Sequence, residues 1–318
     1  CSGNTVKLWN PKEQPVVDMH KYTESFNDAV ISPAGGRILI FSGNNRAKLY
    51  GLQGNLLADL AKFTAPISGI NFSPGGNKLL TTSRDKTAKL WDLKGNLLNS
   101  FEHEAQVGSA VFSHDGSKIL TISLDKTAKL WGAKGNLLSA LKIKTDDIKS
   151  AAISSTGDHV LTWSEGPAKL WDLNGNLLAK LDKHDDIINS AVFSPGGTEI
   201  ITTSNDNTAK LWDTNGKLLA DLDRHTGDVT RAAFSPDGSK VVTVSKDNTA
   251  KLWDLQGNLL ADLDKHTDDV SSAAFKAGGS RIITVSKDGT VKSWYTPEAI
   301  IEWLKTAPIP KLSKEEKD

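Results

Sequence analysis

The sequence contains one cysteine in 318 residues, which excludes an internal disulfide and a zinc site built from several thiolates. It also lacks net charge, because 38 basic residues balance 38 acidic ones. This balance argues against a dedicated nucleic-acid binder, whose affinity comes largely from cationic side chains on phosphates. No apolar run approaches the roughly 18–20 residues that cross a bilayer, so we expect no transmembrane helix. Tyrosine and methionine are rare as well, yet there are nine tryptophans, which indicates that one short motif has been copied many times.

A Lys-Leu-Trp string or a close variant ends at eight positions, namely Trp9, Tyr50, Trp91, Trp131, Trp171, Trp212, Trp253 and Trp294. The intervals between them are 41, 41, 40, 40, 41, 41 and 41 residues. One full unit, residues 212–253, reads WDTNGKLLADLDRHTGDVTRAAFSPDGSKVVTVSKDNTAKLW. A period of this length, with an early His and a late Trp-Asp, resembles the WD-repeat β-propeller family from about residue 2 to 295. The resemblance implies an all-β fold, a seven-bladed β-propeller of four-stranded antiparallel blades.

The residues of one unit predict four short strands without the family name. Lys-Leu-Trp alternates polar and apolar residues, and a glycine turn such as Lys94-Gly95 leads from it into an outer Leu-Leu strand. A polar loop then precedes a short inner strand of the Ala-Ala-Phe type. A Ser-Pro-Asp-Gly turn connects it to a second, apolar strand that ends in serine. One such sheet cannot bury both faces, so neighbouring sheets must cover it.

The strand count bears on how the blades are completed. Inner and second strands occur seven times each, whereas the Lys-Leu-Trp strand occurs eight times. We expect Val16–Met19 to complete the blade of residues 271–295. The propeller then spans residues 11–295, and residues 1–10 are a surplus strand left from a preceding repeat. This surplus favours a fragment of a longer array; the alternative is a mature lipoprotein that is lipidated at Cys1.

The last segment departs from the repeat and predicts a C-terminal helix with a charged tail over residues 296–318. Thr296, Pro297 and Glu298 read as an N-cap, a helix-starting proline and a first-turn acid, and residues 297–306 carry apolar residues at helical spacing. The helix is expected to lie against the propeller wall. The alternative is a docking helix for another domain.

The family resemblance also implies a hydrogen-bonded tetrad of His, Ser, Asp and Trp in each regular blade. The indole N–H is expected to donate to the serine, which donates to the histidine, while the aspartate holds the other imidazole edge. Such a network uses the hydroxyl for structure, so we expect no nucleophile in it. Four blades match: His103/Ser123/Asp125/Trp131, His184/Ser204/Asp206/Trp212, His225/Ser245/Asp247/Trp253 and His266/Ser286/Asp288/Trp294.

Three blades, around Tyr50, Trp91 and Trp171, are irregular, and they are either a binding side or merely degenerate. Their residues at the histidine position are Tyr22, Phe63 and Lys144. The first also has Asn44 in place of the aspartate, and the last lacks the aspartate in Ser-Glu-Gly-Pro. We assign Trp163, in the second strand of the last, to the core; the alternative is an exposed contact.

The sequence shows no catalytic, cofactor or metal motif: it contains no Walker loop, GxGxxG or EF-hand pattern. The recurring histidines belong to separate blades, so we expect no metal site, no cofactor and no enzyme. An enzyme working in the axial channel would need acids, metals or nucleophiles that are not found.

Function is therefore expected in a surface, the top face of the propeller. The candidate partner-binding positions by register are Arg84, Asp147, Lys149, Glu165, Asn189, Asn205, Asp228, Thr230, Lys246, Asp269 and Lys287. Their mixed charge suits a protein or peptide better than a small ligand. We predict a non-catalytic interaction platform, monomeric and cytoplasmic, that binds neither nucleic acid nor membrane. The alternative is a sensor or autoinhibitory module of a larger bacterial signalling protein, with an ATPase or protease-like effector upstream.

Overall fold

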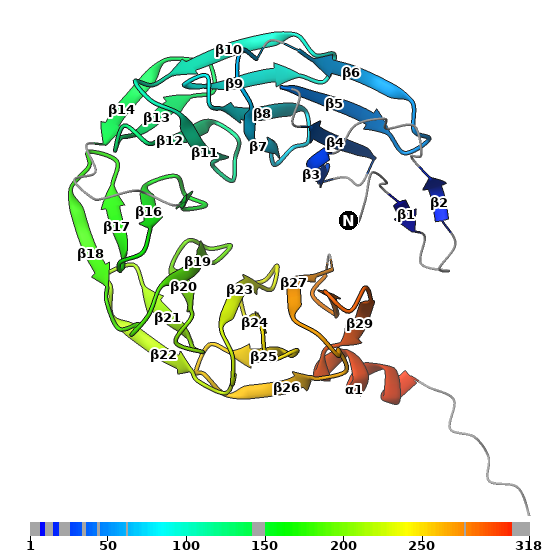
Figure 1. The fold of residues 1–318 in the computed structure, drawn as a ribbon. Helices are drawn as coiled ribbons and strands as arrows, with labels where there is room; N and C mark the ends of the chain where they lie inside the picture. Colours follow the sequence, from blue (N-terminus) through cyan, green and yellow to red (C-terminus); the bar gives the residue numbers. More distant parts are fainter. Residues whose placement is uncertain are drawn as a thin grey trace, which may run out of the picture. The chain divides into compact units, whose positions relative to one another are not determined.

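The computed structural model describes residues 7–9, 15–18, 26–33, 36–42, 45–61, 63–141, 150–276 and 278–306. The chain forms two compact units. The first unit comprises Cys1–Lys183 with Thr214–Gly216, and the second comprises His184–Asp213 with Lys217–Asp318. Within each unit, successive antiparallel sheets follow one another along the chain, and the inner strands of neighbouring sheets contact each other (Figure 1).

The first unit contains a two-stranded sheet and four four-stranded sheets. The two-stranded sheet pairs β1 (Lys7–Trp9) with β2 (Pro15–Asp18). The four-stranded sheets are β3 (Phe26–Ile31), β4 (Arg37–Ser42), β5 (Arg46–Gly51) and β6 (Leu56–Leu60); β7 (Ile67–Phe72), β8 (Lys78–Ser83), β9 (Thr87–Asp92) and β10 (Leu97–Glu102); β11 (Val107–Phe112), β12 (Lys118–Ser123), β13 (Ala128–Gly132) and β14 (Leu137–Leu141); and β15 (Ser150–Ile153), β16 (His159–Trp163), β17 (Ala168–Asp172) and β18 (Leu177–Leu181).

The second unit contains two four-stranded sheets, one three-stranded sheet and a helix. Its strands are β19 (Ile188–Phe193), β20 (Glu199–Ser204), β21 (Ala209–Asp213) and β22 (Leu218–Leu222); β23 (Val229–Phe234), β24 (Lys240–Ser245), β25 (Ala250–Asp254) and β26 (Leu259–Leu263); and β27 (Val270–Phe275), β28 (Arg281–Ser286) and β29 (Val291–Tyr295). The helix is α1 (Pro297–Thr306). Seven of the described sheets contain an inner strand, and we call these seven sheets blades.

Burial along the strands follows from their place in the blade. The second strand is flanked by strands on both sides and covered by neighbouring blades, and in β24 every residue after Lys240 is buried. The outer strand is less covered: burial alternates in β22, because successive side chains point to opposite faces, and the outer strands leave apolar residues such as Leu219 and Leu259 exposed. The seven inner and seven second strands predicted from the sequence are confirmed, except that β16 ends at Trp163, one residue before the expected serine.

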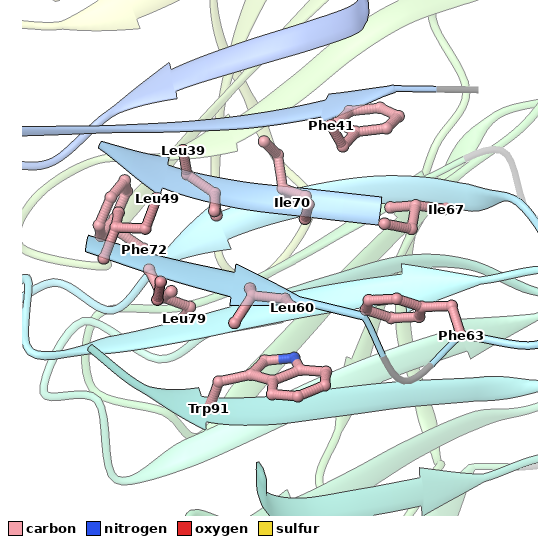
Figure 2. Close-up of a cluster of buried hydrophobic side chains, with 12 residues drawn as sticks. Leu39, Phe41, Leu49, Leu60, Phe63, Ile67, Ile70, Phe72, Leu79 and Trp91 are labelled. Atoms are coloured by element: carbon pink, nitrogen blue, oxygen red, sulfur yellow. The ribbon is translucent and has the colours of Figure 1, made fainter. Parts of the chain in front are cut away.

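The core consists of clusters between consecutive blades. Between blades β3–β6 and β7–β10, Leu39, Leu49 and Leu60 of the first blade pack against the second. Their partners there include Leu79 and Trp91 (Figure 2). In the second unit, Ile201 and Leu211 meet Val241 and Trp253 in the same arrangement. In both pairs, the first blade presents aliphatic residues to the blade that follows, and the second presents a tryptophan to the blade that precedes.

The turn between the third and outer strands fixes how closely blades approach. Gly257 adopts φ +86°, and a Cβ placed on it would lie 3.1 Å from the Cβ of Ala220 in the preceding blade. In the first unit, Gly95 meets Ala58 in the same way at 3.2 Å. A side chain at this turn would both strain the left-handed backbone and push the blades apart.

The expected pairing of residues 16–19 is not found in the described part of the chain. The structure pairs β2 with β1 instead, in the register Lys7↔Asp18, and the sheet of β27, β28 and β29 has three described strands. Residues 7–9 are therefore paired with residues 15–18 in the structure. The hairpin is favoured because it is local in sequence, and its register and bulge repeat those of Lys48↔Asp59 in β5–β6.

The C-terminal helix predicted over residues 297–306 is confirmed as α1, with the Ile300 N–H donating to the Thr296 carbonyl. We expected the helix to lie against the propeller wall, but its apolar side is not buried against the blades. Ile300, Ile301, Trp303 and Leu304 are all exposed. Near its first turn, Pro297 and Ala299 are half-buried and Glu298 pairs with Lys240 of β24 at 3.3 Å.

Candidate functional sites

Blade β23–β26 shows how the recurring polar residues are arranged. The Trp253 indole Nε1–H donates to Thr243 Oγ1 at 2.8 Å, and His225 Nε2 lies 2.8 Å from the same hydroxyl. His225 Nδ1 lies 2.7 Å from Asp247 Oδ2. The tryptophan, threonine and histidine are buried, so the network connects the second strand, the third strand and the loop before the inner strand in a place without water access.

Three other blades repeat this network with threonine at the centre. His Nε2, Thr Oγ1 and Trp Nε1 meet at 2.7–2.8 Å in each, and His Nδ1 lies 2.7–3.2 Å from the aspartate. The sets are His103/Thr121/Asp125/Trp131, His184/Thr202/Asp206/Trp212 and His266/Thr284/Asp288/Trp294.

We predicted that a serine connects the tryptophan to the histidine in each tetrad, and this prediction is wrong. The serines concerned are Ser123, Ser204, Ser245 and Ser286. Val241 pairs with Trp253 across the strands, so Thr243 is the diagonal neighbour within reach of the indole. Ser245 lies two residues further along the same face, about 6–7 Å away. Its hydroxyl donates to the Gly227 carbonyl at 2.7 Å and accepts the Asp247 N–H at 3.0 Å, which closes the turn after the second strand.

A signal for the threonine was present in the sequence. Every blade with a tryptophan in the third strand has a threonine in the second strand, two residues before its serine position. The blade that has Tyr50 in place of the tryptophan has Ile40 in place of the threonine. The two positions change together because the hydroxyl exists to accept the indole N–H.

The aspartate of each set also holds its turn. Asp247 accepts hydrogen bonds from the N–H of Thr226 and from the N–H and hydroxyl of Thr249, at 2.7–3.0 Å. Burial raises the pKa of Asp247, but hydrogen bonds from His225, Thr249 and Thr226 outweigh burial and keep the pKa well below its usual range. In blade β11–β14, burial is likewise outweighed by hydrogen bonds from Thr127 and the Glu104 N–H, and the pKa of Asp125 falls to about 2. These carboxylates stay ionised and structural.

Burial lowers the pKa of His103 and His184, although the neighbouring aspartates oppose this. A histidine with a lowered folded pKa binds fewer protons than its unfolded counterpart, whose pKa is about 6.5. The free energy of unfolding should therefore fall as the pH falls from 7.5 to 5, and urea unfolding at both pH values measures this. Asp125 should add a second loss as the pH falls from about 4 toward 2.

The control for this pH dependence is a double variant, His103→Gln with His184→Gln, which removes both titrating rings. It should unfold at lower urea at pH 7.5 and change less between pH 7.5 and 5 than the unaltered chain. Equal pH dependence of the two proteins would contradict the assignment of the effect to these imidazoles.

Blade β7–β10 shows how one irregular blade compensates for a missing histidine. Phe63 packs on Trp91 with ring centroids 5.5 Å apart (Figure 2), and Trp91 Nε1–H still donates to Thr81 at 2.9 Å. Asp85 pairs with Lys89 at 2.8 Å, and the ammonium lies 5.1 Å above the Phe63 ring. A lysine thus takes the imidazole's place as partner of the carboxylate.

Blade β15–β18 keeps the tryptophan bond with a shorter turn. Trp171 Nε1–H donates to Thr162 at 2.9 Å, although the turn at Glu165-Gly166-Pro167 has one residue fewer than its counterparts. Trp163 is buried, which confirms its assignment to the core. Tyr22, Asn44 and Lys144 lie outside the described residues.

The candidate top-face residues form pairs within three consecutive blades of the second unit. We call these the rim pairs: Asn189–Asn205, Asp228–Lys246 and Asp269–Lys287, joined at 2.7, 2.7 and 2.8 Å. Asp269 raises the pKa of Lys287 through a hydrogen bond to its ammonium.

The other candidate positions are more scattered. Thr230 Oγ1 donates to the Val244 carbonyl at 3.4 Å, and Arg84 donates its backbone N–H to Pro66 at 2.9 Å. Glu165 lies in the short turn of blade β15–β18. Asp147 and Lys149 lie outside the described residues.

Within the described part of the chain, no three His, Cys, Asp or Glu side chains gather closely enough to hold a metal ion. None of the helices described there is long and apolar enough to cross a membrane. The four structural networks above resemble a catalytic Ser-His-Asp set, but in each of them the hydroxyl already accepts an indole N–H.

Comparison with known proteins agrees with this architecture. A family model described as the first β-propeller of IFT122 matches residues 25–295. No curated protein matches the chain. The match covers all seven blades, and the described sheets are those of a WD-repeat propeller. The chain therefore belongs to the family of the IFT122 first β-propeller.

Proposed function

We propose that this chain is a non-catalytic interaction platform that binds a peptide or protein partner through the rim pairs of blades β19–β22, β23–β26 and β27–β29. Propellers of this kind are typically protein-interaction domains. The proposal is carried by one observation: the three blades have the same tetrad, yet they differ at the rim pair, where one has two amides and two have an ion pair.

The chemistry of the rim pairs suits contact with a macromolecule. The side chains of Lys246 and Lys287 are 52% and 62% exposed, and each stands beside its own carboxylate. Alternating charge of both signs along one edge orients a complementary partner and favours fast association. Exposed ion pairs contribute only about 0–1 kcal/mol to folding, so these residues can be changed without unfolding the blades.

Replacing Asp228, Lys246, Asp269 and Lys287 together by alanine should weaken partner capture at least tenfold and leave thermal stability nearly unchanged. The measurement compares what the immobilised chain retains from a lysate of its source cells, with and without the four substitutions. Asp223→Ala with Arg224→Ala is the matched control, because this pair is also exposed and of mixed charge but lies outside the rim pairs. Undiminished capture by the fourfold variant would place the binding surface elsewhere on the chain.

A further inference from the structure

The second unit also has a pocket of about 740 Å³ beside α1. It is lined by the turn that joins β23 to β24, by the turn that joins β27 to β28, by Tyr295, and by residues of α1 between Glu298 and Trp303. These turns lie at the opposite ends of the strands from the rim pairs, so the pocket is separate from the proposed binding surface.

In five blades, the turn between the inner and second strands supplies its own oxygen acceptor for a buried serine hydroxyl. The acceptor comes from different positions of the turn. The pairs are Ser73–Asn77 at 3.0 Å, Ser113–Asp115 at 2.6 Å, Ser154–Asp158 at 2.8 Å, Ser194–Glu199 at 2.7 Å and Ser235–Asp237 at 2.6 Å. Four of these five acceptors are carboxylates, so the repeat favours an anion at this place.

The β23–β24 turn shows the donors that surround the carboxylate. Asp237 accepts the N–H of Ser239 at 3.1 Å and the Ser239 hydroxyl at 2.8 Å, in addition to the Ser235 hydroxyl. These bonds lower the pKa of Asp237 to about 2, with the Ser235 hydroxyl contributing most. The site therefore strongly prefers the charged carboxylate over the acid.

The β27–β28 turn lacks the acceptor, and of the two donor residues it keeps only the second serine, because Lys276 stands where Ser235 stands. Residues 276–281 read Lys-Ala-Gly-Gly-Ser-Arg, without an acidic or amide side chain. Ser280 stands where Ser239 stands in the preceding blade, and Gly278 stands where Asp237 stands. Gly278 and Ser280 both line the pocket, and no atom lies within 4 Å of a Cβ placed on Gly278.

Arg281 supplies a positive charge at this point. Its guanidinium lies 4.3 Å from the centroid of the Tyr295 ring and donates to the Tyr295 hydroxyl. The ring and the hydroxyl of Tyr295 are both uncharged, and no carboxylate among the described residues forms an ion pair with Arg281. A guanidinium can bind a carboxylate by donating two parallel hydrogen bonds to it.

The three carboxylates in the pocket wall are already bound by donors. Asp237 is held by its serines, Glu298 lies 3.3 Å from Lys240, and Glu302 lies 3.7 Å from Lys305. They limit the charge that the pocket tolerates, so a singly charged carboxylate fits better than a doubly charged phosphate. The apolar part of the wall is Trp303, which is 63% exposed.

From these contacts we infer that the pocket binds a peptide carboxylate, which takes the place of the missing turn acceptor between Ser280 and Arg281, while a neighbouring apolar side chain packs on Trp303. The carboxylate belongs either to a Glu or Asp side chain or to the end of the peptide. This is a binding site in addition to the rim pairs.

The test measures fluorescence anisotropy of labelled tetrapeptides with the purified chain. The probes are Gly-Ser-Glu-Leu amide, Gly-Ser-Gln-Leu with a free terminal carboxylate, Gly-Ser-Gln-Leu amide, and the same amide with phosphoserine. At least one of the first two should bind at least tenfold more tightly than the uncharged amide, and the stronger one identifies the source of the carboxylate. Equal binding of all four, preference for the phosphopeptide, or binding of none at millimolar concentration would overturn the inference.

Two variants locate the binding in the pocket. Arg281→Gln should weaken it at least tenfold. Ser280→Asp supplies an internal carboxylate at the position that Asp158 holds in blade β15–β16, and it should weaken binding as strongly, whereas the uncharged Ser280→Asn should weaken it less. The urea midpoint of each variant checks folding. If Arg281→Gln does not fold, the affinity of Ser280→Asp decides whether the peptides bind in this pocket. Unchanged affinity in a folded Ser280→Asp variant would rule out the site, and the fourfold rim variant should bind the peptides normally.

Discussion

Replacing Thr202 by valine should lower the free energy of unfolding by about 2–5 kcal/mol. The Trp212 indole N–H and His184 Nε2 both meet the Thr202 hydroxyl at 2.8 Å; Trp212 and Thr202 are buried, and the His184 side chain is only 2% exposed. Valine keeps the shape but removes the acceptor, so two buried polar groups lose their partner, and each such loss costs about 1–3 kcal/mol.

Replacing the next residue, Thr203, by valine should not lower the free energy of unfolding. Thr203 is fully buried, and its Oγ1 has no hydrogen-bond partner in the described structure. In blade β7–β10 the corresponding Thr82 accepts from Ser68 at 2.9 Å, but here Asn189 stands in the place of Ser68 and turns to Asn205. Thr203→Val should therefore leave the free energy of unfolding unchanged or raise it by about 1 kcal/mol.

Urea unfolding of the two variants, followed by tryptophan fluorescence, measures both effects. The pair is well matched because both residues are buried threonines of β20 and the substitution is identical. The next blade has Val244 at the position of Thr203, which shows that valine fits there. Equal destabilisation by both substitutions would mean that the hydroxyl bonds are not what the bridging threonine contributes.

Gly257→Ala should destabilise the second unit by about 2–4 kcal/mol. The residue has φ +86°, and the new methyl group would lie 3.1 Å from Ala220 Cβ and 3.5 Å from the Asp221 carbonyl oxygen. The backbone strain costs about 1 kcal/mol, and forcing a methyl group into a packed contact adds about 1–3 kcal/mol.

The control is Gly289→Ala, because Gly289 has φ +82° and no atom within 4 Å of its Cβ position. It should cost only the strain, about 1 kcal/mol. Adding Ala220→Gly to Gly257→Ala removes the contact and should recover part of the loss. The urea midpoints of the three variants report the contact directly, and an equal loss for Gly257→Ala and Gly289→Ala would show that the neighbouring blade is not involved.

The sequence predicted most of the fold because strand alternation and turn residues are local properties. The positions of the inner, second and third strands followed from the repeat, and so did the seven blades and α1. The partner of β2 was missed, since several equivalent strands can pair with it and alternation alone does not choose among them. The exposure of α1 was missed because helical spacing of apolar residues says which side is apolar and not whether anything covers it.

The site was predicted less completely for a related reason. Within residues 213–253, His225 and Trp253 are the only histidine and tryptophan, so their roles were distinguishable by type, whereas the aspartate was placed by the register of the repeat. Serine and threonine share one chemistry. The threonine accompanies every third-strand tryptophan in the sequence, and the pairing of Val241 with Trp253 shows that Thr243 is the nearer of the two. The rim pairs could be located by register, but their internal hydrogen bonds depend on side-chain geometry.

Because the contacts between blades are nearly identical, blades can dock on the wrong neighbour while the chain folds. The clusters that contain Trp91 and Trp253 use the same positions with nearly the same side chains, so a newly synthesised blade finds compatible surfaces on several others. Correct docking then depends on closeness along the chain, which makes misassembly during refolding a hazard typical of repeat proteins. Deviations such as Phe63 and Trp163 work against this, because they give two of the blades an identity of their own.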